Sequence, residues 1–208
     1  KHLINPIYSK YRMSNFNWAK ATLSSDIKAG IVPTESEETT HFSIVDRDGN
    51  AVAITTTLNG GFGSMVFVKG AGFLLNNEMD DFSVKPGTPN MFGLLGGEAN
   101  SIQPGKRMLS SMTPTILEKN GELFMVVGTP GGSTIITSVF QTILNTIEFD
   151  MGMQTAVNAK RFHHQWLPDE VVVEKGGMDS LVRTKLEQKG YKFRERKAIG
   201  RVDAILKT

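Results

Sequence analysis

Polar and apolar residues alternate from His41 to Leu58, and this alternation is interrupted once. A period of two residues is typical of a β-strand that buries one face. The interruption is the segment Asp48-Gly49-Asn50, which stands between the runs HFSIVDR and AVAITTTL and has the composition of a tight turn. The pattern therefore predicts a β-hairpin.

A second hairpin is predicted where the apolar runs 114–117 and 123–127 flank Lys119-Asn120-Gly121-Glu122, since Asn-Gly is a favoured hairpin turn. Short apolar stretches at 65–68 and 72–75 follow a glycine-rich loop at 59–64. Further patterns predict helices at 135–147, 154–160 and 178–189, and strands at 171–174, near Tyr191 and near Val202. This order of strands and helices indicates an α+β fold, in which antiparallel hairpins form a sheet that is covered by helices.

Two segments have little hydrophobic pattern. Residues 1–38 mix basic, aromatic and polar positions and end in the acidic run Pro33-Thr34-Glu35-Ser36-Glu37-Glu38, which is typical of an exposed linker. Glycine, proline and asparagine dominate residues 85–106, and a long loop of this kind is either a surface excursion or a lid over a site.

Composition excludes several classes of function. The 208 residues suffice for one domain, and 23 Lys and Arg against 21 Asp and Glu leave no electrostatic footprint for nucleic acid or an anionic membrane. The chain has no cysteine, so disulfides, thiolate catalysis and Cys-ligated metals are excluded. No apolar run reaches the roughly 18 residues of a membrane span, and the first residues lack the apolar core of a signal peptide.

Thr39 has the residue type and position of an amino-terminal nucleophile. If the chain is cleaved after Glu38, Thr39 gains a free α-amine whose reference pKa is about 7.7 to 8.0, close to working pH. That amine can act as the general base for the threonine's own hydroxyl. On local pattern alone, a Thr pair before a strand more often reflects β-propensity than catalysis.

Five motifs give this hypothesis more weight. In order along the chain they are TTHFSIVDRDGNAVAITTTLN, FLLNNEMDDFS, PGKRMLSSMTPTI, GTPGGSTIITSVFQTILN and RFHHQWLPDE. From about residue 35 to about residue 175 the chain resembles the small subunit of γ-glutamyltranspeptidase. The resemblance implies the four-layer αββα sandwich of the amino-terminal nucleophile hydrolases, of which this chain supplies one part.

The resemblance also implies how the chain is organised. Residues 1–38 correspond to the tail of the large subunit before the cleavage point, and residues 39–208 to the small, catalytic subunit. The relatives continue with a further strand and a Gly-x-x-Asp-Pro-Arg-like ending, so the chain is expected to be truncated at its carboxy end. The implied partner is the large subunit of the same precursor. An export signal would lie upstream, which implies a periplasmic or extracellular location.

The site residues follow from the same resemblance. Thr39 is the implied nucleophile for self-cleavage and for turnover, and Thr57 supports its hydroxyl. Asn59, Glu78 and Asp81 hold the α-amine of a γ-glutamyl group, while Ser110 and Ser111 donate to its α-carboxylate. No cofactor is implied.

The resemblance also implies that the oxyanion hole lies at Gly131-Gly132. These glycines open a predicted helix, where backbone N–H groups without an obstructing Cβ make an anion site. A phosphate loop is excluded because GTPGGST lacks the required lysine. Read without the resemblance, a Gly-Gly pair is more often a tight turn before a helix.

Three further features bear on the site. Bacterial relatives usually have a tyrosine where Phe92 stands, so a hydroxyl contact to Asn59 is expected to be lost. No residue of 1–38 matches the large-subunit arginine that binds the α-carboxylate, so this chain alone should bind substrate weakly. His163-His164 is not expected to bind a metal, because neighbouring residues on a helix point in different directions; RFHHQWLPDE is interpreted as a packing and hydrogen-bonding element.

The sequence therefore predicts an enzyme that cleaves the γ-glutamyl amide of glutathione and passes the acyl group to water, an amino acid or a peptide. Two alternatives stay open. The chain could be a non-catalytic fragment with a structural role, or a relative with the same mechanism that acts on poly-γ-glutamate or a β-lactam side chain.

Overall fold

The structure is a computed structural model that describes residues 6, 10, 13, 16–23, 26, 39–88, 96–166 and 168–207. Glu38 and Phe92 lie outside the described residues, as does most of the segment 1–38. The expected change of side chain at Phe92 therefore stays a prediction, and so does the boundary before Thr39.

The first predicted hairpin is confirmed. Strands β1 (Thr39–Val45) and β2 (Ala51–Thr57) pair antiparallel, and Thr39 lies directly opposite Thr57. Asp46 closes the turn, because its Oδ1 accepts the N–H groups of Asp48 and Asn50, each at 2.9 Å. This Asx-type turn fixes the register, and the register fixes which residue faces the candidate nucleophile.

The second predicted hairpin is also confirmed, with strands slightly longer than expected. Strands β5 (Thr115–Lys119) and β6 (Glu122–Gly128) are joined by Asn120 and Gly121, whose φ angles of 56° and 82° are those of a type I′ turn. Strand β10 (Asp203–Leu206) pairs antiparallel with the other edge of β6, giving the order β10-β6-β5. Strand β6 is thus the central strand.

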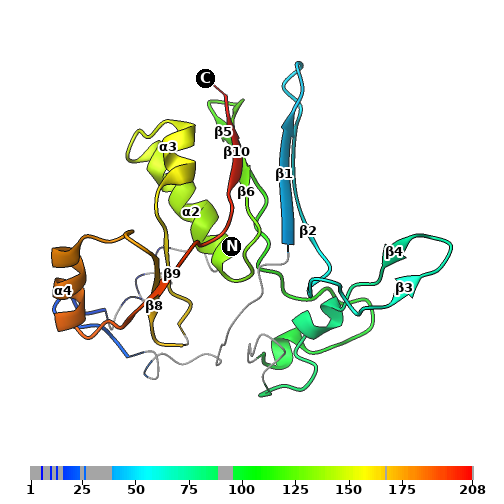
Figure 1. Ribbon diagram of the computed structural model, residues 1–208, viewed down its shortest axis with the longest axis horizontal. Helices are drawn as coiled ribbons and strands as arrows, with labels where there is room; N and C mark the ends of the chain where they lie inside the picture. Colours follow the sequence, from blue (N-terminus) through cyan, green and yellow to red (C-terminus); the bar gives the residue numbers. More distant parts are fainter. Residues whose placement is uncertain are drawn as a thin grey trace.

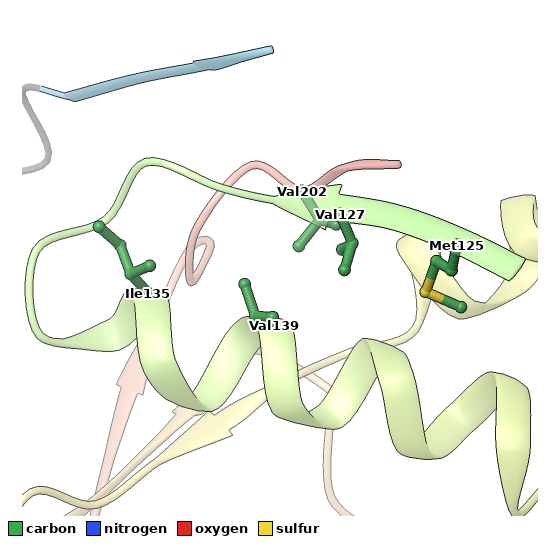
Figure 2. Close-up of a cluster of buried hydrophobic side chains, with 5 residues drawn as sticks. All are labelled: Met125, Val127, Ile135, Val139 and Val202. Carbon is green, nitrogen blue, oxygen red and sulfur yellow. The ribbon is translucent and has the colours of Figure 1, made fainter. Parts of the chain in front are cut away.

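Two helices cover one face of this sheet. They are α2 (Thr134–Ile147) and α3 (Met153–Asn158), both close to the predicted bounds. Figure 2 shows the buried cluster between α2 and the sheet, made of Met125, Val127, Ile135, Val139 and Val202. Alternate residues of β6 point to this helix layer, as a half-buried strand requires.

Helix α2 is rich in β-branched and hydroxyl residues that disfavour helices in isolation. Two of its buried hydroxyls bond to the helix backbone: Thr142 Oγ1 donates to the Ser138 carbonyl at 2.9 Å, and Thr146 Oγ1 donates to the Thr142 carbonyl at 3.1 Å. These bonds satisfy polar groups that would otherwise be costly to bury, so tertiary packing overrides the weak local propensity.

The β1–β2 hairpin packs on the opposite face of the β10-β6-β5 sheet. His41 is only 7% exposed and lies over Gly128, where an added Cβ would come within 2.2 Å of His41 Cε1. Figure 1 shows the resulting order of layers, with α2 and α3, then the central sheet, then β1 and β2. These are three of the four expected layers. The outer face of the hairpin exposes Phe42, Ile44, Val52 and Ile54.

A third sheet lies beside the sandwich. Strand β8 (Val171–Glu174) is fully buried, pairs antiparallel with β7 (Phe162–His163) and pairs parallel with β9 (Phe193–Arg196). Helix α4 (Ser180–Gln188) connects β8 to β9, and its N-cap Asp179 accepts the Leu181 N–H at 2.9 Å. The helical interpretation of His163 was wrong, since this residue ends a strand; strand alternation buries His163 and exposes His164.

The segment after β2 is irregular. It contains the small hairpin of β3 (Phe67–Val68) and β4 (Phe73–Leu74), followed by the 3-10 helices η2 (Glu78–Asp81) and η3 (Glu98–Asn100). Ser83 and Ser101 form a parallel bridge, so the described parts of the predicted loop 85–106 do carry local structure. Within the described residues, no helix is both long and apolar enough to cross a membrane.

Candidate active site

Thr39 is the half-buried first residue of β1, at the end of the sandwich where β6 also ends (Figure 1). Beside it is an open hollow of about 640 Å³. The hollow is lined by Thr39, Thr40, Thr56, Thr57, Leu58, Gly60, Gly61 and Phe62. A substrate bound there would meet the Thr39 hydroxyl at the edge of the sheet.

The turn after β2 connects Thr57 to Asn59. Thr57 Oγ1 accepts the Asn59 N–H at 2.9 Å, which orients the Thr57 hydroxyl on the strand end opposite Thr39. Asn59 has a φ of 71°, a conformation that asparagine tolerates better than most residues, and its side chain is buried. The structure therefore places Asn59 next to the predicted Thr39–Thr57 pair.

Asn77 joins this turn to the acidic motif. Asn59 Nδ2 donates to the Asn77 carbonyl at 3.2 Å, and the Gly60 N–H donates to Asn77 Oδ1 at 2.9 Å. Asn77 directly precedes η2, whose first residue is Glu78. Asn77 was not among the predicted site residues, although its place in the motif NNEMDD gave a signal for it.

Glu78 and Asp81 lie on one turn of η2, and their carboxylates interact. Burial raises the pKa of Asp81 to about 6, and the negative charges of Glu78 and Asp80 contribute to this rise. Burial also raises the pKa of Glu78. Carboxylates crowded in this way are stabilised by a cation, so the arrangement can bind an ammonium group.

Ser110 and Ser111 are tied to the acidic turn through Asn100. Asn100 Nδ2 donates to the Asp81 carbonyl at 2.7 Å, and Asn100 Oδ1 accepts the Leu109 N–H at 3.0 Å. Ser110 is exposed, with its Oγ accepting the Met112 N–H at 3.2 Å, and Ser111 is half-buried. Asn100 therefore connects η2 to Leu109, the residue before the two serines whose hydroxyls can donate to a carboxylate.

Residues 129–133 connect β6 to α2, and this segment is hereafter called the oxyanion loop after the role that the resemblance predicts for it. Gly131 and Gly132 have φ angles of 142° and 58°. A Cβ on Gly131 would come within 2.6 Å of Thr134 Oγ1, so the backbone passes closely over the helix start. Within the described residues, neither glycine N–H donates a hydrogen bond. Two successive free N–H groups at a helix amino terminus can stabilise an oxyanion.

The predicted residues form two groups in this structure. Thr39, Thr57 and Asn59 lie at the strand ends, and Asn77 and Asn100 connect them to the acidic turn and the two serines. Gly131 and Gly132 belong to the loop that follows β6, and β6 ends at the end of the sandwich where β1 begins (Figure 1). Neither these glycines nor Glu78, Asp81, Ser110 and Ser111 line the hollow beside Thr39.

His41 is a buried histidine two residues after Thr39 that was not among the predicted site residues. Its Nδ1 lies 2.8 Å from Thr55 Oγ1 and its Nε2 lies 3.0 Å from Ser43 Oγ. Burial lowers the pKa of His41 although the negative charge of Asp203 acts to raise it, and the net shift favours the neutral ring. The period of two in TTHFSIV gave a signal, because it puts the histidine on the same face of β1 as Thr39.

Comparison with known sequences gives consistent results. The family described as gamma-glutamyltranspeptidase matches residues 1–208. A glutathione hydrolase proenzyme of Escherichia coli (strain K12) is 50% identical over 205 residues, which cover 98% of this chain and 35% of that protein. One from Pseudomonas aeruginosa is 53% identical over 170 residues, covering 82% of this chain and 30% of that protein. The chain therefore spans about a third of the length of these curated relatives.

Solved structures agree with the fold. A mutant gamma-glutamyltranspeptidase of Helicobacter pylori is 55% identical with a TM-score of 0.77, over 80% of this chain and 90% of that chain. A cephalosporin acylase from Bacillus halodurans is 26% identical with a TM-score of 0.78, over 100% of this chain and 35% of that chain. The α+β fold of the amino-terminal nucleophile hydrolases, predicted from the motifs, is confirmed by these neighbours.

Proposed function

Because the chain belongs to the gamma-glutamyltranspeptidase family, we propose that it carries the catalytic centre of a γ-glutamyltransferase and glutathione hydrolase. The observation that carries the proposal is the position of Thr39. It opens β1 beside a hollow, lies opposite Thr57, and is linked through the turn at Asn59 to a pair of carboxylates that favour a bound cation.

In the proposed reaction, Thr39 Oγ attacks the γ-carbonyl carbon of the donor while the Thr39 α-amine takes the hydroxyl proton. The carbonyl oxygen becomes an oxyanion, which the N–H groups of Gly131 and Gly132 stabilise. When the intermediate collapses, the C–N bond breaks and the leaving amine receives the proton. A γ-glutamyl ester on Thr39 remains.

The second half of the reaction resolves this ester. Water or the amine of an acceptor attacks the ester carbonyl, the Thr39 amine removes the attacker's proton, and Oγ leaves with it. Water gives glutamate, and an amino acid or peptide gives a new γ-glutamyl compound.

The same hydroxyl would also create the catalytic amine. It attacks the carbonyl carbon of Glu38 in the precursor, the acyl group passes from nitrogen to oxygen, and water hydrolyses the resulting ester.

Substrate recognition requires opposite charges on one carbon of the γ-glutamyl group. Glu78 and Asp81, with Asn59, hold the α-amine, and Ser110 and Ser111 donate to the α-carboxylate. The raised pKa of Asp81 supports this assignment, because a carboxylate that is unfavourable without a partner gains most from an ammonium group.

The proposed partner is the large subunit of the same precursor. The apolar outer face of β1 and β2, with Ile44 53% exposed and Val52 43% exposed, supports a covering layer supplied by another segment. The curated relatives are proenzymes of which this chain spans about a third. We place the assembled enzyme in the periplasm or outside the cell, by family resemblance.

The alternatives are less well supported. A transpeptidase enzyme CapD from Bacillus anthracis is 29% identical with a TM-score of 0.59, and the cephalosporin acylase is 26% identical. Both share the fold, but the glutathione hydrolase proenzymes reach 50% and 53% identity. Higher identity favours glutathione over poly-γ-glutamate or a β-lactam side chain.

The test is to express the complete precursor and measure two quantities. Intact mass should show a species that begins at Thr39. The purified protein should release glutamate from glutathione, and a dipeptide acceptor should divert the γ-glutamyl group to a new product. A protein that stays uncleaved and inert towards glutathione, poly-γ-glutamate and γ-glutamyl anilides would instead support the structural alternative.

The carboxylate pair gives a pH prediction. Asp81 must be ionised to attract an ammonium group, and its pKa is raised to about 6. L-Glutamate carries the same α-amine and α-carboxylate as the donor, so its inhibition constant reports recognition without the catalytic amine. Because the ionised fraction of Asp81 falls as pH drops through this pKa, L-glutamate should bind about tenfold more weakly at pH 5 than at pH 7.

Two substitutions check the origin of this pH dependence. Asp80→Asn removes one of the charges that raise the pKa of Asp81, so the titration should move to lower pH. Asp81→Asn should remove the titration step near pH 6 and weaken binding at pH 7 by roughly 10- to 100-fold, the loss of a charged hydrogen bond. If the profile of Asp81→Asn still matches that of the unmodified enzyme, the assignment of Asp81 is wrong.

A further inference from the structure

Arg161 and Glu174 form a buried ion pair, and neither residue is among the predicted site residues. Their side chains are only 8% and 6% exposed, and Nη1 lies 3.7 Å from Oε1. Arg161 leads into β7 and Glu174 ends β8. A buried pair of this kind adds little net stability, because the cost of removing both charges from water offsets their attraction. Its position in the fold therefore suggests another role.

The pair holds both backbone polar groups of Ile199. Glu174 Oε1 accepts the Ile199 N–H at 2.7 Å, and Arg161 Nη1 donates to the Ile199 carbonyl at 3.3 Å. Glu174 Oε2 also accepts the Arg161 N–H at 3.2 Å, and Arg161 Nη2 donates to the Val157 carbonyl of α3. Ile199 is completely buried, so its backbone is fixed from both sides.

The residue after Ile199 presses against the oxyanion loop. Gly200 has a φ of +65°, and its Cα lies 3.3 Å from the position that a Cβ on Gly131 would take. A Cβ on Gly200 itself would come within 2.9 Å of Thr129 Oγ1 and 3.4 Å of the Pro130 carbonyl oxygen. The two backbone segments can approach this closely only because both positions are glycine.

A hydrogen-bond chain completes the contact. The Arg201 N–H donates to Thr129 Oγ1 at 2.7 Å, and Thr129 Oγ1 donates in turn to the Pro130 carbonyl at 2.7 Å. Thr129 is fully buried. Residues 199–201 therefore contact the oxyanion loop by packing and by hydrogen bonds.

We propose that Arg161 and Glu174 are positioning residues for the oxyanion hole. By fixing Ile199, the pair sets where Gly200 meets the oxyanion loop, and this sets the direction of the Gly131 and Gly132 N–H groups. The proposal rests on the function proposed above, in which those N–H groups stabilise the oxyanion. Donors of this kind act only when they are aimed at the place where charge develops.

The test uses the complete, processed enzyme and a γ-glutamyl p-nitroanilide. The fraction of chain cleaved before Thr39, measured by intact mass, counts competent sites, and kcat/KM for p-nitroaniline release reports acylation per competent site even when a variant folds less efficiently. The variants are Glu174→Gln and Arg161→Lys, which preserve size, and Gly200→Ala, which leaves the pair intact. In all three variants acylation should be about 10- to 100-fold slower, because catalytic groups that are displaced from their working position lose this much of their effect on the rate.

Two further readouts separate positioning from general destabilisation. The inhibition constant of L-glutamate should stay within about twofold in each variant, because substrate recognition involves other residues. The double variant Glu174→Gln/Gly200→Ala should be little slower than the slower single variant, because both changes act through the same loop.

The matched control is Arg183→Gln. Arg183 also pairs with glutamates, Glu187 at 3.0 Å and Glu195 at 2.9 Å, but on the exposed side of α4. Its acylation rate should stay within about twofold of the unmodified enzyme.

An unchanged acylation rate in Gly200→Ala, or in both Glu174→Gln and Arg161→Lys, would overturn the proposal while leaving the enzyme assignment intact. An unmodified enzyme that releases no p-nitroaniline would instead defeat the proposed function.

Discussion

Thr39→Ala is expected to leave the precursor uncleaved and to eliminate turnover of γ-glutamyl p-nitroanilide, with a loss of at least about 1000-fold. The substitution removes the only atom that can form the ester, while the smaller alanine side chain would still fit the end of β1. Thr39→Ser keeps a hydroxyl on the same carbon and should retain both reactions at a reduced rate. Intact mass reports cleavage, and the release of p-nitroaniline reports turnover.

The control for this prediction is Thr184→Ala. Thr184 is an exposed threonine on α4 whose hydroxyl donates to the Ser180 carbonyl at 2.9 Å, far in the chain from the strand ends. This variant should be cleaved and should turn over substrate like the unmodified enzyme. Cleavage before residue 39, or measurable turnover, in Thr39→Ala would show that another group is the nucleophile.

Local patterns were sufficient for the hairpins, and therefore for the pairing of Thr39 with Thr57. The turn residues Asp46 to Asn50 fix the register, and a slip of one residue would have placed Thr56 opposite Thr39 instead. The Asn120-Gly121 turn fixed the second hairpin in the same way. Helix α2 was also predictable, because its apolar positions recur at helical spacing despite the hydroxyl residues between them.

Contacts between distant segments could not be read from any local pattern. Nothing near His41 indicates that it lies over Gly128, and nothing near Glu174 indicates that it binds the backbone of Ile199. Strand β7 was missed because two residues are too short to show a period. The family motifs supplied the candidate site residues, whereas the connections through Asn77 and Asn100 required the structure.

Gly131→Ala is the second substitution from which we expect a large effect. The φ angle of 142° at Gly131 is one that residues with a Cβ rarely adopt. The added methyl would also come within 2.6 Å of Thr134 Oγ1 and 3.3 Å of the Gly200 backbone, which cannot rotate away as a side chain can. The oxyanion loop must therefore shift, and its N–H groups with it.

The expected result for Gly131→Ala is a fall in kcat of about 100- to 1000-fold, equivalent to about 2.7 to 4 kcal/mol, which is the usual cost of losing one oxyanion donor. The affinity for L-glutamate should be unchanged, because recognition of the α-amine and α-carboxylate is assigned to other residues. Gly121→Ala is the matched control: Gly121 has a φ of +82°, but an added Cβ would meet nothing within 4 Å. Both substitutions introduce backbone strain and should lower Tm, but only Gly131→Ala should lower kcat. Equal kinetics in the two variants, with similar losses of Tm, would show that the loop contributes stability rather than donors to the oxyanion.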